Sequence, residues 1–198
     1  MARLKLDKHD WLSLVDQSGL LISEPVLMDK FPDGPEKVEQ WVYRKYHKQF
    51  QRSRLPGDAV ARRNIFLDFL LRELLGLTRR VSGHDLPEGC KVALVEFDQM
   101  LKADWAILDV ERRPVFLGMT VQPDQSLTRR ETASGRWKAT PVTKMERLMQ
   151  ETGVPLGLLT NGEDFRLIYA PPGLSPSAIT FSAQTFADEK STLDAFYT

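Results

Sequence analysis

The segment from Gly153 to Ala170 places the strongest constraint on the fold. Val154–Thr160 is almost entirely apolar, and its length suits a β-strand. The dipeptide Asn161-Gly162 follows at once and favours a tight hairpin turn. Phe165–Ala170 then returns to aromatic and aliphatic residues. We therefore predict two strands joined by this turn.

Three more strands and a helix are expected before this pair. Thr140-Pro141 offers an N-cap followed by proline at the first helical position, and the predicted helix runs to Glu151. The order of three strands, one helix and two strands predicts an α/β fold, with a mixed five-stranded sheet and a crossover helix. The three earlier strands are Lys91–Phe97, Lys102–Val110 and Pro114–Val121, and Ala178–Phe181 is a candidate for one more.

The N-terminal part of the chain has a helical pattern instead. Apolar residues at helical spacing predict helices over Glu36–Phe50 and Ala59–Leu77, separated by turns rich in proline and glycine. We expect a helical part over residues 1–80 and an α/β core over 81–198, together forming one compact unit. The apolar stretch Leu193–Tyr197 runs up to Thr198 without a turn signal, which suggests a domain taken from a longer protein.

Composition excludes some classes of protein. No apolar run reaches the ~18–20 residues of a membrane span, and Met1–Asp7 does not resemble a secretory signal. The single cysteine, Cys90, excludes an intrachain disulfide, so we expect a cytoplasmic protein. Formal net charge is +0, but residues 37–54 and 129–147 are locally basic. Such runs are either solvated helix faces or nucleic-acid contacts.

Two segments carry a resemblance to a known family. Thr152–Gly162 followed by Phe165–Pro171 resembles a strand–turn–strand of the PD-(D/E)XK nuclease fold, as it occurs at the N-terminus of Type I and Type IIG restriction–modification proteins. Trp137–Pro141 with Lys144–Leu148, and the opening Ser18–Leu27, resemble large DNA methyltransferases. Those methyltransferases accompany phage-defence systems of the DISARM and BREX type. The resemblance implies a restriction-endonuclease-like core.

The same resemblance implies a catalytic signature that this chain lacks. In the family one strand supplies an aspartate, which Asp104 matches, and the next strand supplies Glu-X-Lys. Here that next strand, Leu117–Gln122, has neither a carboxylate nor a lysine. Carboxylates are what Mg²⁺ requires for phosphodiester hydrolysis. Asp104 is therefore a vestigial candidate, retained for a structural role, and we expect no metal site and no cofactor.

Basic residues around the predicted crossover helix are the candidates for DNA contact. Phosphate contacts of this kind give affinity with little sequence preference. Trp137 could stack or wedge against DNA; alternatively, it packs over the sheet and the charges only solubilise the loop. The basic candidates are Arg129, Arg130, Arg136, Lys138 and Lys144.

Three hypotheses for function follow. The favoured one is a non-catalytic, DNA-engaging or scaffolding N-terminal module of a restriction–modification or phage-defence DNA methyltransferase. Its partners would be double-stranded DNA and the rest of the methyltransferase or other defence subunits. The second is an active Mg²⁺-dependent nuclease with relocated ligands, for which Glu73, Glu96 and Asp109 are the acidic candidates. The third is a protein-interaction domain that docks a defence subunit through the helices of residues 7–78.

Overall fold

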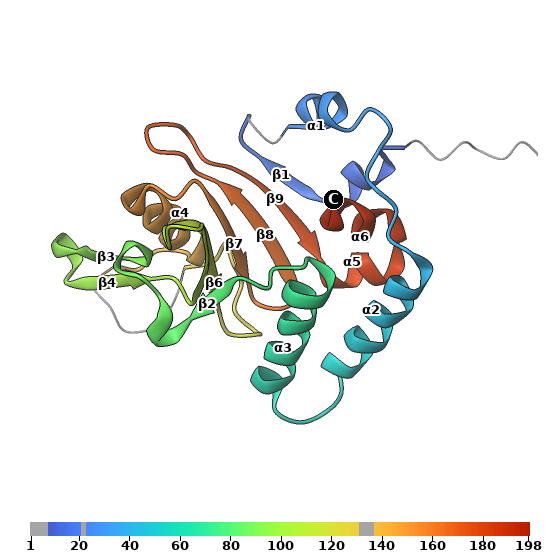
Figure 1. Ribbon diagram of the computed structural model, residues 1–198, viewed down its shortest axis with the longest axis horizontal. Coiled ribbons are helices and arrows are strands. Elements are labelled where there is room, and N and C mark those ends of the chain that lie inside the picture. The colour runs from blue at the N-terminus through green and yellow to red at the C-terminus, as the bar shows by residue number, and fades with distance from the viewer. Residues whose placement is uncertain (1–7, 21–22, 131–136) are drawn as a thin grey trace, which may run out of the picture.

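A seven-stranded mixed sheet forms the centre of the protein in the computed structural model, which describes residues 8–20, 23–130 and 137–198 (Figure 1). The strand order is β1-β9-β8-β7-β6-β5-β2. β6 and β7 are parallel, and every other neighbouring pair in this sheet is antiparallel. The strands are β1 (Asp16–Ser18), β2 (Arg80–Ser82), β5 (Trp105–Leu108), β6 (Pro114–Thr120), β7 (Leu156–Thr160), β8 (Asp164–Tyr169) and β9 (Ser177–Ser182).

A separate two-stranded hairpin, β3 (Lys91–Leu94) with β4 (Gln99–Lys102), lies beside the main sheet. The expectation that Lys91–Phe97 is a strand of the main sheet is therefore wrong. The predicted strand Lys102–Val110 is also divided, because the chain leaves β4 at Ala103 and enters the main sheet as β5. The backbone N–H of Ala103 donates to Cys90 O in the hairpin, whereas that of Asp104 donates to Gly118 O in the main sheet.

The predicted five-stranded sheet is thus too small. β6, β7, β8 and the turn between the last two are confirmed, and β9 confirms the additional candidate strand. β1 and β2 were not predicted, because each has only three residues and such a length cannot display an alternating pattern. The α/β class is confirmed.

The crossover helix between β6 and β7 is α4 (Pro141–Thr152), as predicted. Thr140 Oγ1 accepts a hydrogen bond from the backbone N–H of Thr143 at 3.1 Å. Gly153 ends the helix with a φ of +74°, a left-handed conformation that glycine adopts without steric cost. α4 covers one face of the sheet with Met145, Leu148 and Met149, which are fully buried.

The remaining helices gather on the other face. The predicted helix from residue 59 is α3 (Ala59–Asp68), which continues as a π-helix over Phe69–Leu74. The others are α1 (Glu24–Lys30), α2 (Gln40–Ser53), α5 (Ala183–Asp188) and α6 (Lys190–Tyr197). There are also 3₁₀ turns at Asp10–Leu14, Gly83–Asp85, Glu88–Cys90 and Val95–Phe97, and the last two belong to the α4 side, where Cys90 and Phe97 pack. Within the described residues, no helix is long and apolar enough to cross a membrane.

Alternate residues of the central strands feed two hydrophobic cores. Leu158 belongs to the core shared with α2, α3, α5 and α6, whereas Leu159 belongs to the core under α4. Helices from both ends of the chain meet in the first core, where the Tyr46 hydroxyl of α2 donates to Ala183 O of α5 at 2.7 Å. The helical N-terminal part therefore completes the core of the sheet.

Candidate functional site

Asp104 lies at the entrance to β5, beside the end of β6. Its backbone N–H donates to Gly118 O at 2.8 Å, and its Oδ2 accepts from the backbone N–H of Thr120 at 2.6 Å. The carboxylate therefore bridges the gap that opens where β5 and β6 separate.

The strand opposite Asp104 presents no acidic group. Gly118 and Thr120 lie on the same face of β6 as the Trp105 ring, and Met119 packs on the other face under α4. The indole of Trp105 covers Gly118 so closely that a Cβ there would lie 1.9 Å from Trp105 Cε2. The Trp105 indole therefore occupies the space over Gly118, and β6 places no carboxylate beside Asp104.

A polar cavity of about 500 Å³ opens in front of Asp104. α3, β2, β5 and the end of β6 supply its walls. Two arginines, two aspartates, three neutral polar residues and the apolar side chains of Leu67 and Trp105 line it. The charged and polar members are Arg63, Asn64, Asp68, Arg80, Ser82, Asp104 and Thr120.

Charges in the cavity are partly compensated. Arg63 Nη1 donates to Val121 O, and its Nη2 donates to Asn64 Oδ1 at 2.9 Å. Arg80 Nη2 donates to Asp68 Oδ1 at 2.6 Å. Burial raises the pKa of Asp104 above its usual range, although the Thr120 N–H and the nearby Arg63 and Lys102 charges oppose the shift. Asp104 remains exposed to solvent, so its raised pKa comes from partial burial by the neighbouring residues and not from complete burial.

The donor set is a poor fit for the Mg²⁺ ion of a nuclease. Mg²⁺ needs carboxylate oxygens that are free to coordinate it. Asp68 is in ion pairs with Arg80 and Arg72 at 2.6 and 3.5 Å, and Asn64 Oδ1 accepts from Arg63, which leaves Asp104 and two hydroxyls. Across residues 8–20, 23–130 and 137–198, no group of three His, Cys, Asp or Glu side chains could hold a metal. The cavity can therefore hold a ligand by charge and hydrogen bonds, but it offers too few free carboxylate oxygens for the Mg²⁺ ion of a nuclease.

Relocated acids do not complete the site. Glu73 is in an ion pair with Lys45, Glu96 pairs with Arg147 at 3.4 Å, and Asp109 pairs with Arg113 at 2.8 Å. None of these three acids lines the cavity in front of Asp104. Each is a helix-end or surface charge, so the geometry does not favour the hypothesis of a relocated nuclease centre.

The predicted DNA-contact residues lie elsewhere. Arg129 and Arg130 are exposed on the segment between β6 and α4, and Lys138 is exposed just before α4. Lys144 is half-buried on the first turn of α4, and Arg136 lies outside the described residues. None of the described candidates lines the Asp104 cavity.

Trp137 has a packing role. Its ring stacks on that of Phe97, with centroids 5.1 Å apart and an interplanar angle of 13°. Both rings rest against the hydrophobic core under α4. The alternative in which Trp137 packs is therefore the one that its surroundings favour, because one face of the indole is already covered.

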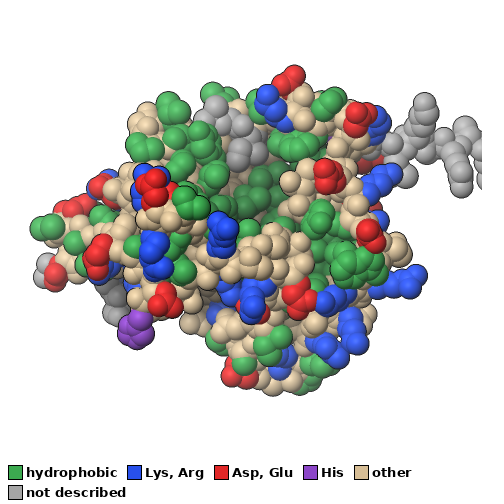
Figure 2. Space-filling model, viewed as in Figure 1, with side chains coloured by type: hydrophobic (Ala, Val, Ile, Leu, Met, Phe, Trp, Pro, Cys, Tyr) green, Lys and Arg blue, Asp and Glu red, His purple; other side chains and the backbone are tan. Residues whose placement is uncertain are grey.

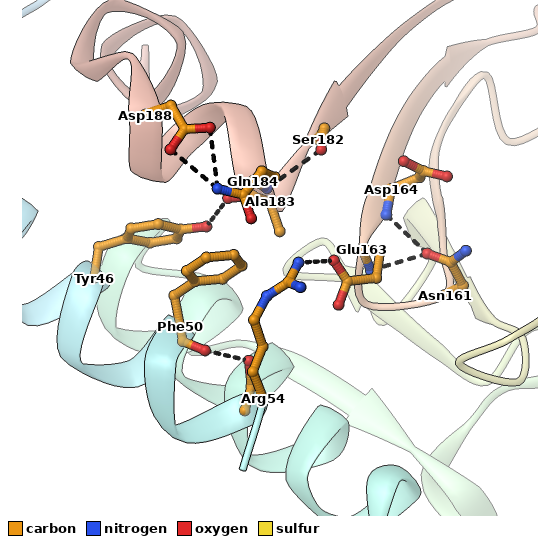
Figure 3. Close-up of polar contacts among 11 residues, drawn as sticks. Tyr46, Phe50, Arg54, Asn161, Glu163, Asp164, Ser182, Ala183, Gln184 and Asp188 are labelled. Carbon is orange, nitrogen blue, oxygen red and sulfur yellow. Dashed lines mark hydrogen bonds and ion pairs between the residues drawn. The ribbon is translucent and has the colours of Figure 1, made fainter.

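Asn161 fixes the turn between β7 and β8 and the segment after β6 (Figure 3). Its Oδ1 accepts from the backbone N–H groups of Glu163 and Asp164 at 2.9 and 2.7 Å. Its Nδ2 donates to Gln125 O at 3.0 Å, which holds the segment after β6. Gly162 has a φ of +95°, so this pair has the turn role that the sequence indicates. Glu163 in turn accepts from Arg54 at 2.6 Å and ties the end of α2 to the turn (Figure 3).

Sequence reasoning missed the arginines of the cavity. Arg63 follows Arg62 in a helix whose pattern predicts only a buried and a solvated face, and Arg80 follows Arg79 at the start of an unpredicted strand. Their convergence depends on the pairing of β2 with β5, which no local signal shows. Comparison of the chain with protein-family models, with curated proteins and with solved structures found no match.

Proposed function

We propose that this chain is a non-catalytic module that engages duplex DNA. The observation that carries the proposal is the β6 strand beside Asp104, where Gly118 lies under an indole and Thr120 stands in place of a charged group. A site with two arginines and one accessible carboxylate is suited to contact and not to metal-dependent hydrolysis.

Exposed cations support the DNA half of the proposal. Arg129, Arg130 and Lys138 are exposed near the start of α4, and among the described residues they form no ion pair. Lys and Arg side chains without acidic partners are the groups that neutralise phosphates and release counterions. Such contacts give affinity for DNA with little dependence on base sequence.

DNA binding is tested by fluorescence anisotropy with a labelled duplex at low and moderate salt. We expect binding at low salt that weakens as salt rises, and a smaller salt slope for Arg129→Ala/Arg130→Ala, by roughly 1.8 for two phosphate contacts. The matched control is Arg72→Ala/Arg113→Ala, which removes two exposed arginines that already pair with acids. Absence of binding at low salt would refute the proposal.

The non-catalytic half is tested by plasmid nicking with Mg²⁺ and with Mn²⁺. We expect no nicking above background from the purified chain. Nicking that is lost in Asp104→Ala would instead support the alternative of an active nuclease. Nicking that Asp104→Ala leaves unchanged would point to a contaminating enzyme.

The resemblance of Trp137–Leu148 and Thr152–Pro171 to defence-associated proteins motivates a broader proposal. We place the module in the cytoplasm, with a restriction–modification or phage-defence DNA methyltransferase. Co-expression with such a methyltransferase and capture of the pair in nuclease-treated lysate tests this placement. A chain that never associates with it under these conditions argues against the placement while leaving DNA binding intact.

A scaffolding role is the second candidate, and the tips of α2 and α3 favour it. A pocket of about 240 Å³ opens between them, and Ile65 on its rim is 65% exposed. Leu55, in the turn between the two helices, is 58% exposed. Exposed apolar residues next to a pocket are typical of a protein contact. Capture of a defence subunit by the chain without nucleic acid, abolished by Ile65→Asp, tests this role.

A further inference from the structure

One face of α2 carries a row of cations that the structure leaves without partners. The opposite face is buried through Tyr46 and Phe50, which pack against Phe66 and Phe186. The outward face carries Arg44, Lys48 and Arg52, and all three are exposed. Figure 2 shows blue Lys and Arg side chains gathered over the α2 region at the lower right of the molecule.

The three cations are not neutralised by nearby acids. α2 contains no acidic residue. Of the acids near this helix, Glu73 pairs with Lys45 and Glu163 pairs with Arg54, while Glu39, just before α2, accepts a hydrogen bond from Trp41. In the part of the chain that the structure describes, Arg44, Lys48 and Arg52 form no side-chain hydrogen bond or ion pair. A chain with a formal net charge of +0 therefore concentrates positive charge here.

The spacing of these cations has an energetic cost. Residues four apart on a helix are neighbours, about 6 Å apart along the axis. Like charges in that relation destabilise a helix by about 0.2–0.5 kcal/mol per pair. All three also lie within roughly two Debye lengths at 0.1 M salt, where that length is ~10 Å. They therefore act as one positive stripe, and a bound polyanion would offset their repulsion.

Trp41 stands at the start of the same helix. Its side chain is 61% exposed, and its indole N–H donates to Glu39 Oε2 at 2.7 Å. The hydrogen bond holds a large aromatic ring in a fixed position at the surface. Together, a fixed indole and a row of three cations form an extended contact surface, which differs from the compact cavity at Asp104.

We propose that the exposed face of α2, formed by Trp41, Arg44, Lys48 and Arg52, binds the phosphate backbone of duplex DNA. This inference rests on the proposed function. It adds a second DNA-contact surface, separate from the one at Arg129 and Arg130. Duplex DNA carries one negative charge per ~1.7 Å of axis, so a straight row of cations meets phosphates without any required base sequence. The row is polar, apart from Trp41 at one end, which suits a phosphate backbone better than the apolar centre of a protein interface.

The test measures duplex DNA binding by the full chain and by the triple variant Arg44→Ala/Lys48→Ala/Arg52→Ala. Alanine keeps the helix, because its helix propensity is the highest. We expect the dissociation constant to rise about 10-fold or more at low salt, and the slope of log K against log salt to fall by roughly 2.7, which corresponds to three lost phosphate contacts. Circular dichroism and urea unfolding confirm that the variant is folded.

The matched control is Lys30→Ala/Lys91→Ala/Arg113→Ala. It removes the same amount of charge, but each of these residues already pairs with an acid: Asp29, Glu88 and Asp109 respectively. We expect its affinity and salt slope to stay near those of the wild type. An equal loss in the control would mean that net charge alone sets the affinity, and would overturn the assignment to α2.

The remaining outcomes separate this inference from the proposed function. Wild-type binding with an unchanged slope in the α2 variant would overturn the inference and leave the DNA-binding function standing. No wild-type binding would overturn both. The last outcome concerns polyglutamate and unlabelled duplex DNA, used as competitors at equal charge. If polyglutamate displaces the chain from labelled DNA as effectively as the duplex does, the surface prefers acidic proteins, and this too would overturn the inference.

Discussion

Position 118 requires glycine, because the Trp105 side chain leaves no room for a Cβ atom there. The ring of Trp105 lies directly over it, and a Cβ would approach three ring atoms to within 1.9–2.3 Å. We predict that Gly118→Ala destabilises the protein by about 1–3 kcal/mol, because the indole has to leave its place over Gly118, where it stacks on Phe116 of the same strand. Urea unfolding followed by tryptophan fluorescence measures the change.

Gly89→Ala is the control for this substitution. Gly89 also lacks a positive φ, but its added Cβ would meet only the ring of Pro114 at 3.3 Å. A small shift of one proline accommodates that contact, so we expect a much smaller loss of stability. Equal losses at the two positions would show that the Trp105 ring does not occupy the space over Gly118.

Asp104 predicts a dependence of stability on pH. Burial raises its pKa in the folded protein above the ordinary value of 3.8. The folded state therefore binds the proton more tightly than the unfolded state, and the ionised carboxylate lowers stability as pH rises from 3.8 through the folded pKa. Asn retains an oxygen that can accept from the Thr120 N–H, so we expect Asp104→Asn to be more stable than the wild type at pH 7.

The gain from Asp104→Asn should shrink as pH falls through the raised pKa toward 3.8, because the carboxyl of the folded wild type is then protonated and no longer carries a desolvated charge. Unfolding in urea at a series of pH values from 3.5 to 7 measures it. A gain that is constant across the series would show that desolvation of the Asp104 charge is not its source. Asp109→Asn is the contrasting case, because hydrogen bonds from Arg113 lower the pKa of Asp109 in the folded protein. The ionised carboxylate therefore stabilises the wild type, and we expect the variant to be less stable than the wild type at neutral pH, with a difference that shrinks at low pH.

At the scale of elements, the β7–β8 turn holds together segments that are distant in sequence. Asn161 is buried and makes three hydrogen bonds, two within the turn and one to Gln125 O. We predict that Asn161→Ala costs about 2–4 kcal/mol, since it removes a buried carboxamide and leaves three partly buried backbone groups without this partner. Asn161→Asp keeps the acceptor for Glu163 and Asp164 but loses the donor to Gln125, so its cost should be smaller. Thermal unfolding of the two variants measures both costs, and equal costs would argue against the role of the acceptor.

Elements with strong local signals were predictable from the sequence. α4 has an N-cap threonine, a proline in the first turn and a glycine after its last residue, and β7–β8 has the Asn-Gly turn. β1 and β2 have no such signals, since each is short and is held in place only by its partner strands, β9 and β5. The hairpin β3–β4 was assigned to the wrong sheet because pairing partners are set by tertiary packing.

In the candidate site, too, only residues with a local sequence signal could be predicted. Asp104 and the absence of acidic residues from β6 could be identified from local sequence, because they belong to two neighbouring segments. Arg63 and Arg80 could not, because α3 and β2 reach Asp104 only after the N-terminal helices pack on the sheet. Residues that meet across a large sequence separation leave no local pattern in one sequence.

At the scale of the whole molecule, the sequence boundary between residues 80 and 81 falls inside β2. The helical part also supplies one side of a shared core: Trp11 stacks on Phe181 with centroids 6.4 Å apart, and Tyr46 meets Phe186 edge-on at 5.9 Å. Exposing a few such aromatic rings costs about 1.5–3 kcal/mol each. That total is comparable to the ~5–15 kcal/mol by which a typical domain is stable.

We therefore predict that a fragment of residues 79–198, which retains β2, does not fold cooperatively by itself. The apolar face of β7, β8 and β9 would be open to water where α2 and α3 now cover it. The expected result is a shallow urea transition and strong binding of a hydrophobic dye. Adding residues 8–78 as a separate peptide should restore a sharper transition, because the two parts are held together by side-chain packing and by the pairing of β1 with β9, which do not require a continuous chain. A fragment that unfolds in one steep transition without the peptide would show that the sheet with α4, α5 and α6 is an independent domain.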